Sequence, residues 1–293
     1  MHFGSLVAAL ASFLDARRRG GEWLVRIEDL DPPRTVAGAA DRQLATLEAF
    51  GLRWDGPVLY QSTRTAAYAA ALDALIARGL VYPCGCSRKE IAAHGLAGLE
   101  GPRYPGTCRD GLPPGRAPRA WRFATRPGAI QFVDRIQGPR HQDLANAIGD
   151  FVVRRADGIH AYQLAVVVDD AWQGITDVVR GADLIDSTPR QIALQQALGL
   201  STPTYAHVPL VVDGAGRKLS KSDAAQPVDP RDPLPALLRA WAFLGQAPLE
   251  PRPASAAELL ERAVAGWDIA RVPRRPRRLG PLAGESSPSA RAR

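Results

Sequence analysis

Two lysines are the residues whose type and setting most clearly indicate chemistry. The chain has three lysines among 37 basic residues, and two of them, Lys218 and Lys221, fall in the stretch GRKLSKSD. A lysine is a compact point charge on a flexible stem, so its retention in an arginine-rich chain favours a mobile phosphate-binding loop over a merely polar hairpin loop. Gly214 and Gly216 precede the stretch and supply the flexibility that a closing loop needs.

A second candidate phosphate site lies at the start of the chain. Apolar residues at helical spacing, from Leu6 to Leu14, predict a helix with His2, Gly4 and Ser5 at its N-terminus. The amide groups and dipole of a helix N-terminus bind anions. These three residues are therefore candidate phosphate ligands.

The three cysteines form a third candidate site. Cys84, Cys86 and Cys108 all fall in residues 84–118, a stretch dense in Gly and Pro. An odd count argues against a disulfide framework, and a segment with little apolar core favours a structural metal. Zinc needs a fourth ligand, and spacing alone favours His94, because three cysteines and a histidine are a common set. Three unligated cysteines in a loop are the alternative.

The elements that would position these groups alternate between helical and strand patterns, which is typical of an α/β protein. After the first helix, which ends at Gly20, the predicted helices are residues 37–50, 66–78, 188 onward, 235–243 and 256–265. The predicted strands are residues 22–28, 120–124, 129–134, 150–155, 162–170, 175–181 and 207–212. The helix after Ser187 and Thr188 would have a hydroxyl cap, with Pro189 in its first turn.

Composition indicates a soluble globular protein, with 46% hydrophobic and 23% charged residues. The first apolar stretch lacks the basic flank of a signal peptide, so we expect a cytoplasmic protein that does not enter a membrane. Residues 271–293 hold seven Arg and one Glu, which is six of the seven net positive charges. This Pro- and Ser-rich tail is expected to be disordered. The remainder is nearly neutral, so charge alone is weak evidence for nucleic-acid binding.

Several motifs resemble one family. HFGS and KLSKS resemble the two signatures of class I aminoacyl-tRNA synthetases, in the family's order. WLVRIEDLDPPR, AYQLAVVVDD, ITDVVRGADL and STPRQIALQQALG resemble the catalytic core of the glutamate-specific members. From His2 to about Pro273 the chain is similar to the glutamyl-Q tRNA(Asp) synthetases, a shortened branch. A glutamyl-tRNA synthetase carries a further helical anticodon-binding region, which we do not expect in a chain of this length.

This resemblance implies a Rossmann-type catalytic domain and a two-step reaction. Glutamate would be activated with ATP, assisted by Mg²⁺ and without tRNA, and then transferred to the queuosine base at the wobble position of tRNA(Asp). His2 and Lys221 would be catalytic, because they would stabilise the charge that develops on the α-phosphate. Gly4, Ser5 and Lys218 would complete the ATP site.

The resemblance also implies the ligands of glutamate. Glu28 would hold the α-ammonium group, Tyr162 would donate a hydrogen bond, and Arg180 would grip the γ-carboxylate in bidentate fashion. Without the resemblance, Glu28 would be an ion-pair partner of Arg26 or Arg34, Tyr162 a core residue and Arg180 a surface residue.

For the metal, the family pattern of Cys-x-Cys followed by Tyr-x₃-Cys implies one zinc ion per chain. Its ligands would be Cys84, Cys86, Tyr104 and Cys108, with Tyr104 in place of His94.

The predicted organisation follows from these motifs. Residues 1–83 and 119–230 would form the catalytic domain around the zinc-binding insertion 84–118, followed by a helical part at 231–270 and the basic tail at 271–293. We expect a monomer. Two other functions stay open: a glutamyl-tRNA synthetase that charges the tRNA 3′ end, and a non-catalytic RNA-binding remnant of a synthetase.

The resemblance predicts one further feature. Members of the family carry a strand and a loop with an Arg and a Ser before the histidine signature. We therefore expect the reading frame to start upstream of Met1, with about 10–20 further residues, the length of a short strand and its loop.

Overall fold

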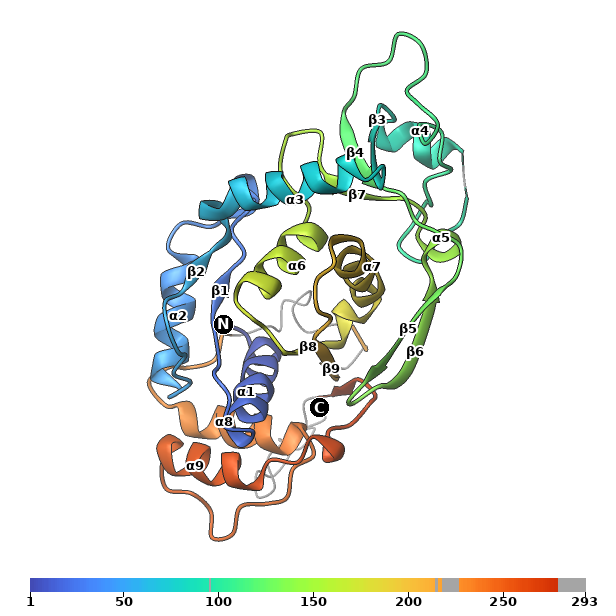
Figure 1. The fold of residues 1–293 in the computed structure, drawn as a ribbon. Helices are drawn as coiled ribbons and strands as arrows, with labels where there is room; N and C mark the ends of the chain where they lie inside the picture. The colour runs from blue at the N-terminus through green and yellow to red at the C-terminus, as the bar shows by residue number, and fades with distance from the viewer. Residues whose placement is uncertain (95, 214–215, 218–226, 279–293) are drawn as a thin grey trace, which may run out of the picture.

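The N-terminal helix organises the core of the protein. The structure is a computed structural model, which describes residues 1–94, 96–213, 216–217 and 227–278. Helix α1 (Phe3–Arg18) forms where apolar residues recur at helical spacing, and Leu6, Leu10 and Leu14 are fully buried. It packs against α8 (Pro233–Phe243) and α9 (Ala256–Gly266), which lie together at one end of the molecule (Figure 1).

A mixed four-stranded sheet lies beside α1, and the order of its strands is β6-β5-β9-β8. The strands are β5 (Ala129–Asp134), β6 (Gly138–Asp143), β8 (Asp177–Gly181) and β9 (Thr204–Val208). The pairs β8/β9 and β5/β9 are parallel, whereas β5 and β6 form an antiparallel hairpin. A separate parallel pair consists of β1 (Arg26–Ile27) and β2 (Leu59–Tyr60). The α/β class that was predicted from the periodicity is confirmed.

Helices on the far side of the sheet enclose a second apolar core. Helices α3 (Thr65–Ala77), α6 (Tyr162–Trp172) and α7 (Thr188–Leu198) contribute to it, whereas α2 (Ala39–Ala49) packs on the first core through Leu47. Short helical pieces lie between the longer elements: η1 (Pro32–Arg34), η2 (Gln61–Arg64), α5 (Leu144–Ala147), η3 (Ala182–Ser187) and η5 (Ile269–Arg271). Side chains of α3, α6 and α7 share this core with Phe123 and Phe151.

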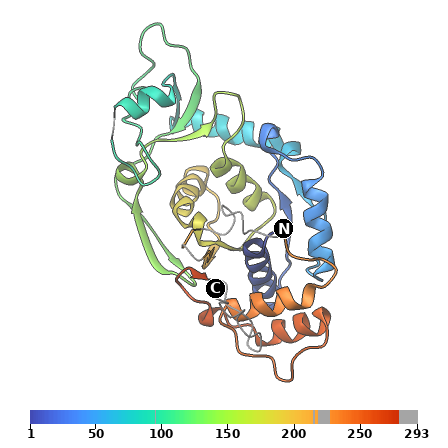
Figure 2. The same cartoon turned by 180° about the vertical axis from the view of Figure 1, so that it is seen from behind.

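The cysteine-bearing segment lies at the end opposite to α8 and α9, as both views show (Figures 1 and 2). It leaves the sheet β3-β4-β7, in which β3 (Val81–Cys84), β4 (Ala120–Phe123) and β7 (Phe151–Arg154) are antiparallel. Within it, α4 (Arg88–Ala93) begins with a capping box between Ser87 and Glu90.

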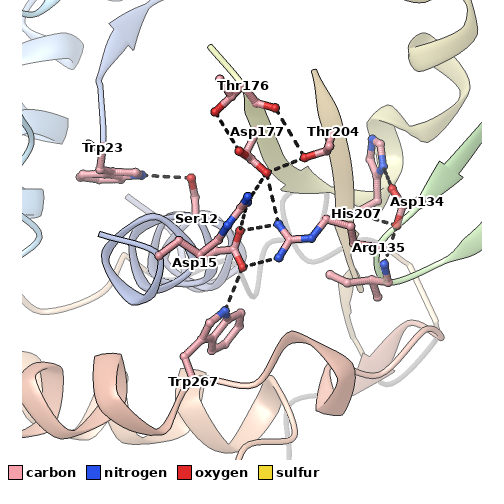
Figure 3. Close-up of polar contacts among 12 residues, drawn as sticks. Ser12, Asp15, Trp23, Asp134, Arg135, Thr176, Asp177, Thr204, His207 and Trp267 are labelled. Atoms are coloured by element: carbon pink, nitrogen blue, oxygen red, sulfur yellow. Dashed lines mark hydrogen bonds and ion pairs between the residues drawn. The ribbon is translucent and has the colours of Figure 1, made fainter. Parts of the chain in front are cut away.

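An ion pair at the buried carboxylate of Asp15 links α1 to the sheet and to the C-terminal helices. Asp15, on α1, accepts two hydrogen bonds from Arg135, at 2.5 and 2.9 Å, and one from the indole of Trp267 at 3.2 Å (Figure 3). Arg135 follows β5, and Trp267 follows α9. One carboxylate therefore joins the N-terminal helix to the sheet and to the C-terminal helices.

The prediction of a strand over residues 162–170 is wrong. Residues 162–172 form α6, in which Leu164, Val166 and Val167 are buried. An apolar run that is buried on several sides loses the alternation that separates a strand from a helix, so packing between α3 and α7 overrides the β preference of its valines.

Other boundaries also shift. Only Arg26 and Ile27 of residues 22–28 are in a strand, and residues 207–212 split at Pro209, which has no amide to donate, into β9 and β10 (Val211–Val212). Ser187 does not cap α7 with its side chain, because it already ends η3 in helical geometry.

The expectation of disorder from Arg271 onward is wrong for residues 271–278. Strand β11 (Arg277–Arg278) pairs in parallel with β10. The rest of the predicted tail, residues 279–293, lies outside the described residues. In the described part of the chain, no helix combines the length and the apolar character needed to cross a membrane.

Candidate active site

The N-terminus of α1 is built around the ring of His2. His2 is the N-cap residue, and its Nδ1 accepts a hydrogen bond from the Ser5 amide at 3.3 Å. Its Nε2 lies 2.9 Å from Ser5 Oγ, so a hydrogen bond links the two side chains. Gly4 leaves room for the ring, because a Cβ atom there would lie 3.1 Å from His2 Cε1.

A small cavity of about 140 Å³ opens beside this helix end. His2, Gly4 and Ser5 line one side, and Gly181 and Val208, at the carboxyl ends of parallel strands β8 and β9, line the other. Helix amides and the ends of parallel strands are the usual setting for bound phosphate. The predicted ligands His2, Gly4 and Ser5 thus share one cavity.

The lysine loop cannot be placed in this cavity, since Lys218 and Lys221 lie outside the described residues. The chain that follows them does return to the site. Pro227 pairs with His2 in an isolated β-bridge, and the Val228 amide donates to the Met1 carbonyl at 3.0 Å.

Arg180 lies one residue before Gly181, and the groups around its guanidinium form a second candidate site, which we call the recess. Its Nη2 donates to Thr188 Oγ1 at 3.0 Å and to Gln191 Oε1 at 2.8 Å, and its Nη1 faces the Tyr162 hydroxyl at 3.5 Å. Within the described residues, every group that accepts a hydrogen bond from Arg180 is neutral. Its positive charge is therefore available to an anion.

Glu28 lies within electrostatic range of the same site. Its side chain is 42% exposed, yet desolvation by the surrounding protein raises the pKa of its carboxyl group. Tyr162 contacts Arg180 directly, whereas Glu28 is linked to it only through charge: burial raises the pKa of Glu28, and Arg26 and, more weakly, Arg180 oppose this shift.

The ion-pair alternative for Glu28 is supported in part, because Arg26 is its strongest charged neighbour. Arg26 lies 3.8 Å from Glu28 but donates at 2.7 Å to Asp170, its closer partner. Burial raises the pKa of Asp170, and the charge of Arg26 opposes this rise. The sequence analysis did not predict Asp170. It also did not predict Thr188 and Gln191, which accept hydrogen bonds from Arg180. The adjacent acids that follow the apolar run of α6 were the one available signal for Asp170.

The cysteine sulfurs converge as a metal site requires. The three Sγ atoms lie within 4.8 Å of one another, and those of Cys86 and Cys108 are 3.7 Å apart. Zinc–sulfur bonds of about 2.3 Å in a tetrahedron place sulfurs about 3.8 Å apart, so the spacing fits zinc. The Tyr104 hydroxyl lies among them, 3.4 Å from Cys84 Sγ and 3.8 Å from Cys86 Sγ.

His94 lies outside this cluster. It is exposed, and its Nδ1 contacts the Glu90 carbonyl at 2.6 Å. Tyr104 is 5% exposed, and burial raises the pKa of its hydroxyl. The geometry therefore favours Tyr104 over His94 as a neighbour of the three sulfurs.

Two ion pairs tie the cysteine segment to the rest of the protein. Arg109, next to Cys108, pairs with the buried Asp150, which also accepts from the Tyr82 hydroxyl at 2.6 Å. Arg190, on α7, donates to both carboxylate oxygens of Glu100. Asp150 therefore links the segment to the sheet beneath it.

The fold and the site together define a class of protein. Residues 1–245 match the family described as tRNA synthetases class I (E and Q), catalytic domain. A glutamate tRNA ligase from Elizabethkingia meningosepticum has the same fold, with a TM-score of 0.79 and 24% identity over 96% of this chain. The chain spans 64% of the length of that ligase.

Closer relatives narrow the class. The glutamyl-Q tRNA(Asp) synthetase of Chromobacterium violaceum is 56% identical over 95% of this chain and 93% of its own length. The glutamyl-Q tRNA(Asp) synthetase of Dechloromonas aromatica is 57% identical over 94% and 92%. The chain belongs to the glutamyl-Q tRNA(Asp) synthetase family.

Proposed function

We propose that the protein activates glutamate with ATP, without tRNA, and transfers the glutamyl group to the queuosine base at the wobble position of tRNA(Asp). One observation carries the first step. Consecutive residues of β8 lie at the two candidate sites, because Gly181 lines the cavity at the α1 N-terminus and Arg180 precedes it. An anionic amino acid held by Arg180 would therefore lie beside a phosphate held at the helix.

In the nucleotide site, the α1 amides beyond Gly4 and the side chains of His2 and Ser5 would bind phosphate oxygens. Lys218 and Lys221 would close over the ATP, with Mg²⁺ on its phosphates. As the glutamate carboxylate attacks the α-phosphorus and pyrophosphate leaves, negative charge develops on the phosphate oxygens. His2 and Lys221 would stabilise that charge.

In the recess, the Arg180 guanidinium and the Tyr162 hydroxyl would bind the γ-carboxylate, and Glu28 would bind the α-ammonium group. The bound ammonium would favour the ionised form of Glu28, whose pKa is otherwise raised. The recess would thus bind each charged end of glutamate with a side chain of opposite charge.

We further propose that Cys84, Cys86, Tyr104 and Cys108 hold one zinc ion, because the three sulfurs lie within 4.8 Å of one another and the phenol oxygen lies within 3.8 Å of two of them. Zinc would then stabilise residues 84–118 as a structural insertion within a monomeric protein. With ATP and tRNA as substrates, the reaction would take place in the cytoplasm.

The decisive experiment is ATP–pyrophosphate exchange with glutamate in the absence of tRNA, followed by transfer to tRNA(Asp) with and without queuosine. We expect exchange without tRNA, and glutamyl transfer only to the queuosine-bearing tRNA. Exchange that requires tRNA, with charging of the 3′ end, would identify a glutamyl-tRNA synthetase. An absence of exchange would support a non-catalytic remnant.

A further inference from the structure

Beneath Arg180 lies a buried pair of side chains to which the proposed reaction assigns no role. His207, on β9, is fully buried, and its Nδ1 lies 2.6 Å from Oδ2 of Asp134, the last residue of β5 (Figure 3). Its Nε2 lies 3.1 Å from the Nε of Arg180. Asp134, His207 and Arg180 therefore form one line of hydrogen bonds from the interior of the sheet to the recess.

The hydrogen-bond partners determine where the imidazole carries its proton. The Nε–H of Arg180 can only donate, so His207 Nε2 must accept. The single proton of a neutral imidazole then lies on Nδ1, where it is donated to the carboxylate of Asp134. Burial and the charge of Arg180 lower the pKa of His207 against the opposing effect of Asp134, so the ring is neutral.

Asp134 cannot rotate to offer its other oxygen. Its Oδ1 accepts hydrogen bonds from the backbone amides of Ile136 at 2.9 Å, Gln137 at 2.7 Å and His207 at 3.2 Å. These three bonds leave Oδ2 for the imidazole. The backbone of two neighbouring strands thereby sets which atom of Asp134 the ring of His207 meets.

We propose that His207 is a positioning residue for Arg180, and that Asp134 acts through it by holding the imidazole in the tautomer that accepts from Arg180. This inference rests on the proposed role of Arg180 as the ligand of the γ-carboxylate. With Nε held by His207 and Nη2 held by Thr188 and Gln191, the guanidinium keeps Nη1 toward the recess. A fixed cation in that place favours the carboxylate of glutamate over the neutral amide of glutamine.

Two substitutions of His207 form a matched pair that tests this role. His207→Asn places an amide near the position of Nδ1, so it keeps a donor for Asp134 and loses the acceptor for Arg180. His207→Gln places an amide oxygen near the position of Nε2, so it keeps the acceptor for Arg180. A merely structural role would not distinguish the two variants by their effect on one substrate.

Asp134→Asn changes the tautomer without touching the imidazole. The three backbone amides keep the remaining oxygen, so the new NH₂ group faces Nδ1 and forces the imidazole proton onto Nε2. Two donors then meet at Arg180. The ¹⁵N chemical shifts of His207, measured in the wild type and in this variant, report the tautomer independently of activity.

We expect His207→Asn and Asp134→Asn to raise the KM for glutamate in pyrophosphate exchange by about 10-fold or more, as for loss of one hydrogen bond to a charged group. The KM for ATP should be unchanged, selectivity for glutamate over glutamine should fall, and His207→Gln should retain most of the wild-type KM. Thermal unfolding of each variant checks the fold.

Equal effects of His207→Asn and His207→Gln, or a parallel rise in the KM for ATP, would overturn the positioning role. An unchanged imidazole tautomer in Asp134→Asn would do the same for the part assigned to Asp134. Arg180→Ala separates this inference from the proposed function. If that variant keeps its KM for glutamate, the assignment of Arg180 itself is wrong; if it loses activity while His207→Asn does not, only the positioning role fails.

Discussion

Replacing Asp15 by asparagine should measure how strongly α1 is held to the rest of the protein. Oδ1 of Asp15 accepts from Arg135 and Trp267, and Oδ2 accepts from Arg135. Whichever way the amide of an asparagine is turned, its NH₂ group therefore faces a donor. The side chain of Asp15 is 4% exposed, so solvent cannot replace the lost bonds.

The size of the effect follows from what Arg135 retains. Removing one partner of a buried ion pair costs about 3–5 kcal/mol. Arg135 is 26% exposed and keeps Asp177 at 3.5 Å, so we expect a loss of about 2–3 kcal/mol in the free energy of unfolding, below that range. With an m-value of about 3 kcal/mol/M, the urea midpoint should fall by roughly 0.7–1 M.

The assay is urea unfolding followed by tryptophan fluorescence, with Asp229→Asn as the matched control. Asp229 pairs with Arg231 on the surface, where the arginine side chain is 88% exposed, so its midpoint should not move. If Asp15→Asn shifts the midpoint no more than this control does, the carboxylate does not fasten the helix as described.

The other predictions concern the sites. Gly4→Ala should keep thermal stability but lower glutamate-dependent exchange, because the new Cβ would displace the ring of His2; full activity would contradict this. Lys221→Ala should cut exchange by about 10²-fold or more without unfolding, through loss of one charge partner of the transition state. The zinc content, measured by mass spectrometry, should fall in Cys108→Ser and Tyr104→Phe and stay unchanged in His94→Ala. If zinc is instead kept in Tyr104→Phe and lost in His94→Ala, the fourth ligand is His94. Hydrogen bonds from Arg109, Tyr82 and Thr125 outweigh burial and lower the pKa of Asp150. The resulting stability is complete above the unfolded pKa of about 3.9 and is lost as pH falls below it, so urea midpoints should drop on acidification less steeply in Asp150→Asn than in the wild type.

The sequence carries the local part of this structure. The period of Leu6, Leu10 and Leu14 predicts α1, and the strands β4, β5, β7 and β8 were predicted because short apolar runs between turn residues have few other solutions. The failure at α6 has the opposite cause, since a helix buried on several sides shows no period. Propensity then favours the wrong structure.

The site was predictable only in part. His2, Gly4 and Ser5 are neighbours in the chain, so the joint role proposed for them follows from one helix end. Arg180 and Tyr162 were identified through resemblance alone, because nothing local distinguishes them from surface and core residues. Asp134 and His207 were missed, since 73 residues separate them and only the pairing of β5 with β9 makes them neighbours.

The closure of α1 by the C-terminal helices has a consequence for synthesis. The rings of Phe3 and Phe243 pack edge to face, with their centroids 6.3 Å apart. Asp15 accepts a hydrogen bond from Trp267, which lies 252 residues further along the chain. Ribosomes add about 5–20 residues per second, so the apolar face of α1 waits about 13–50 s for its partners. Contacts of such sequence separation also slow folding once the chain is complete. During that interval the nascent chain exposes leucines that the folded protein hides, which makes it a substrate for chaperones that bind apolar segments.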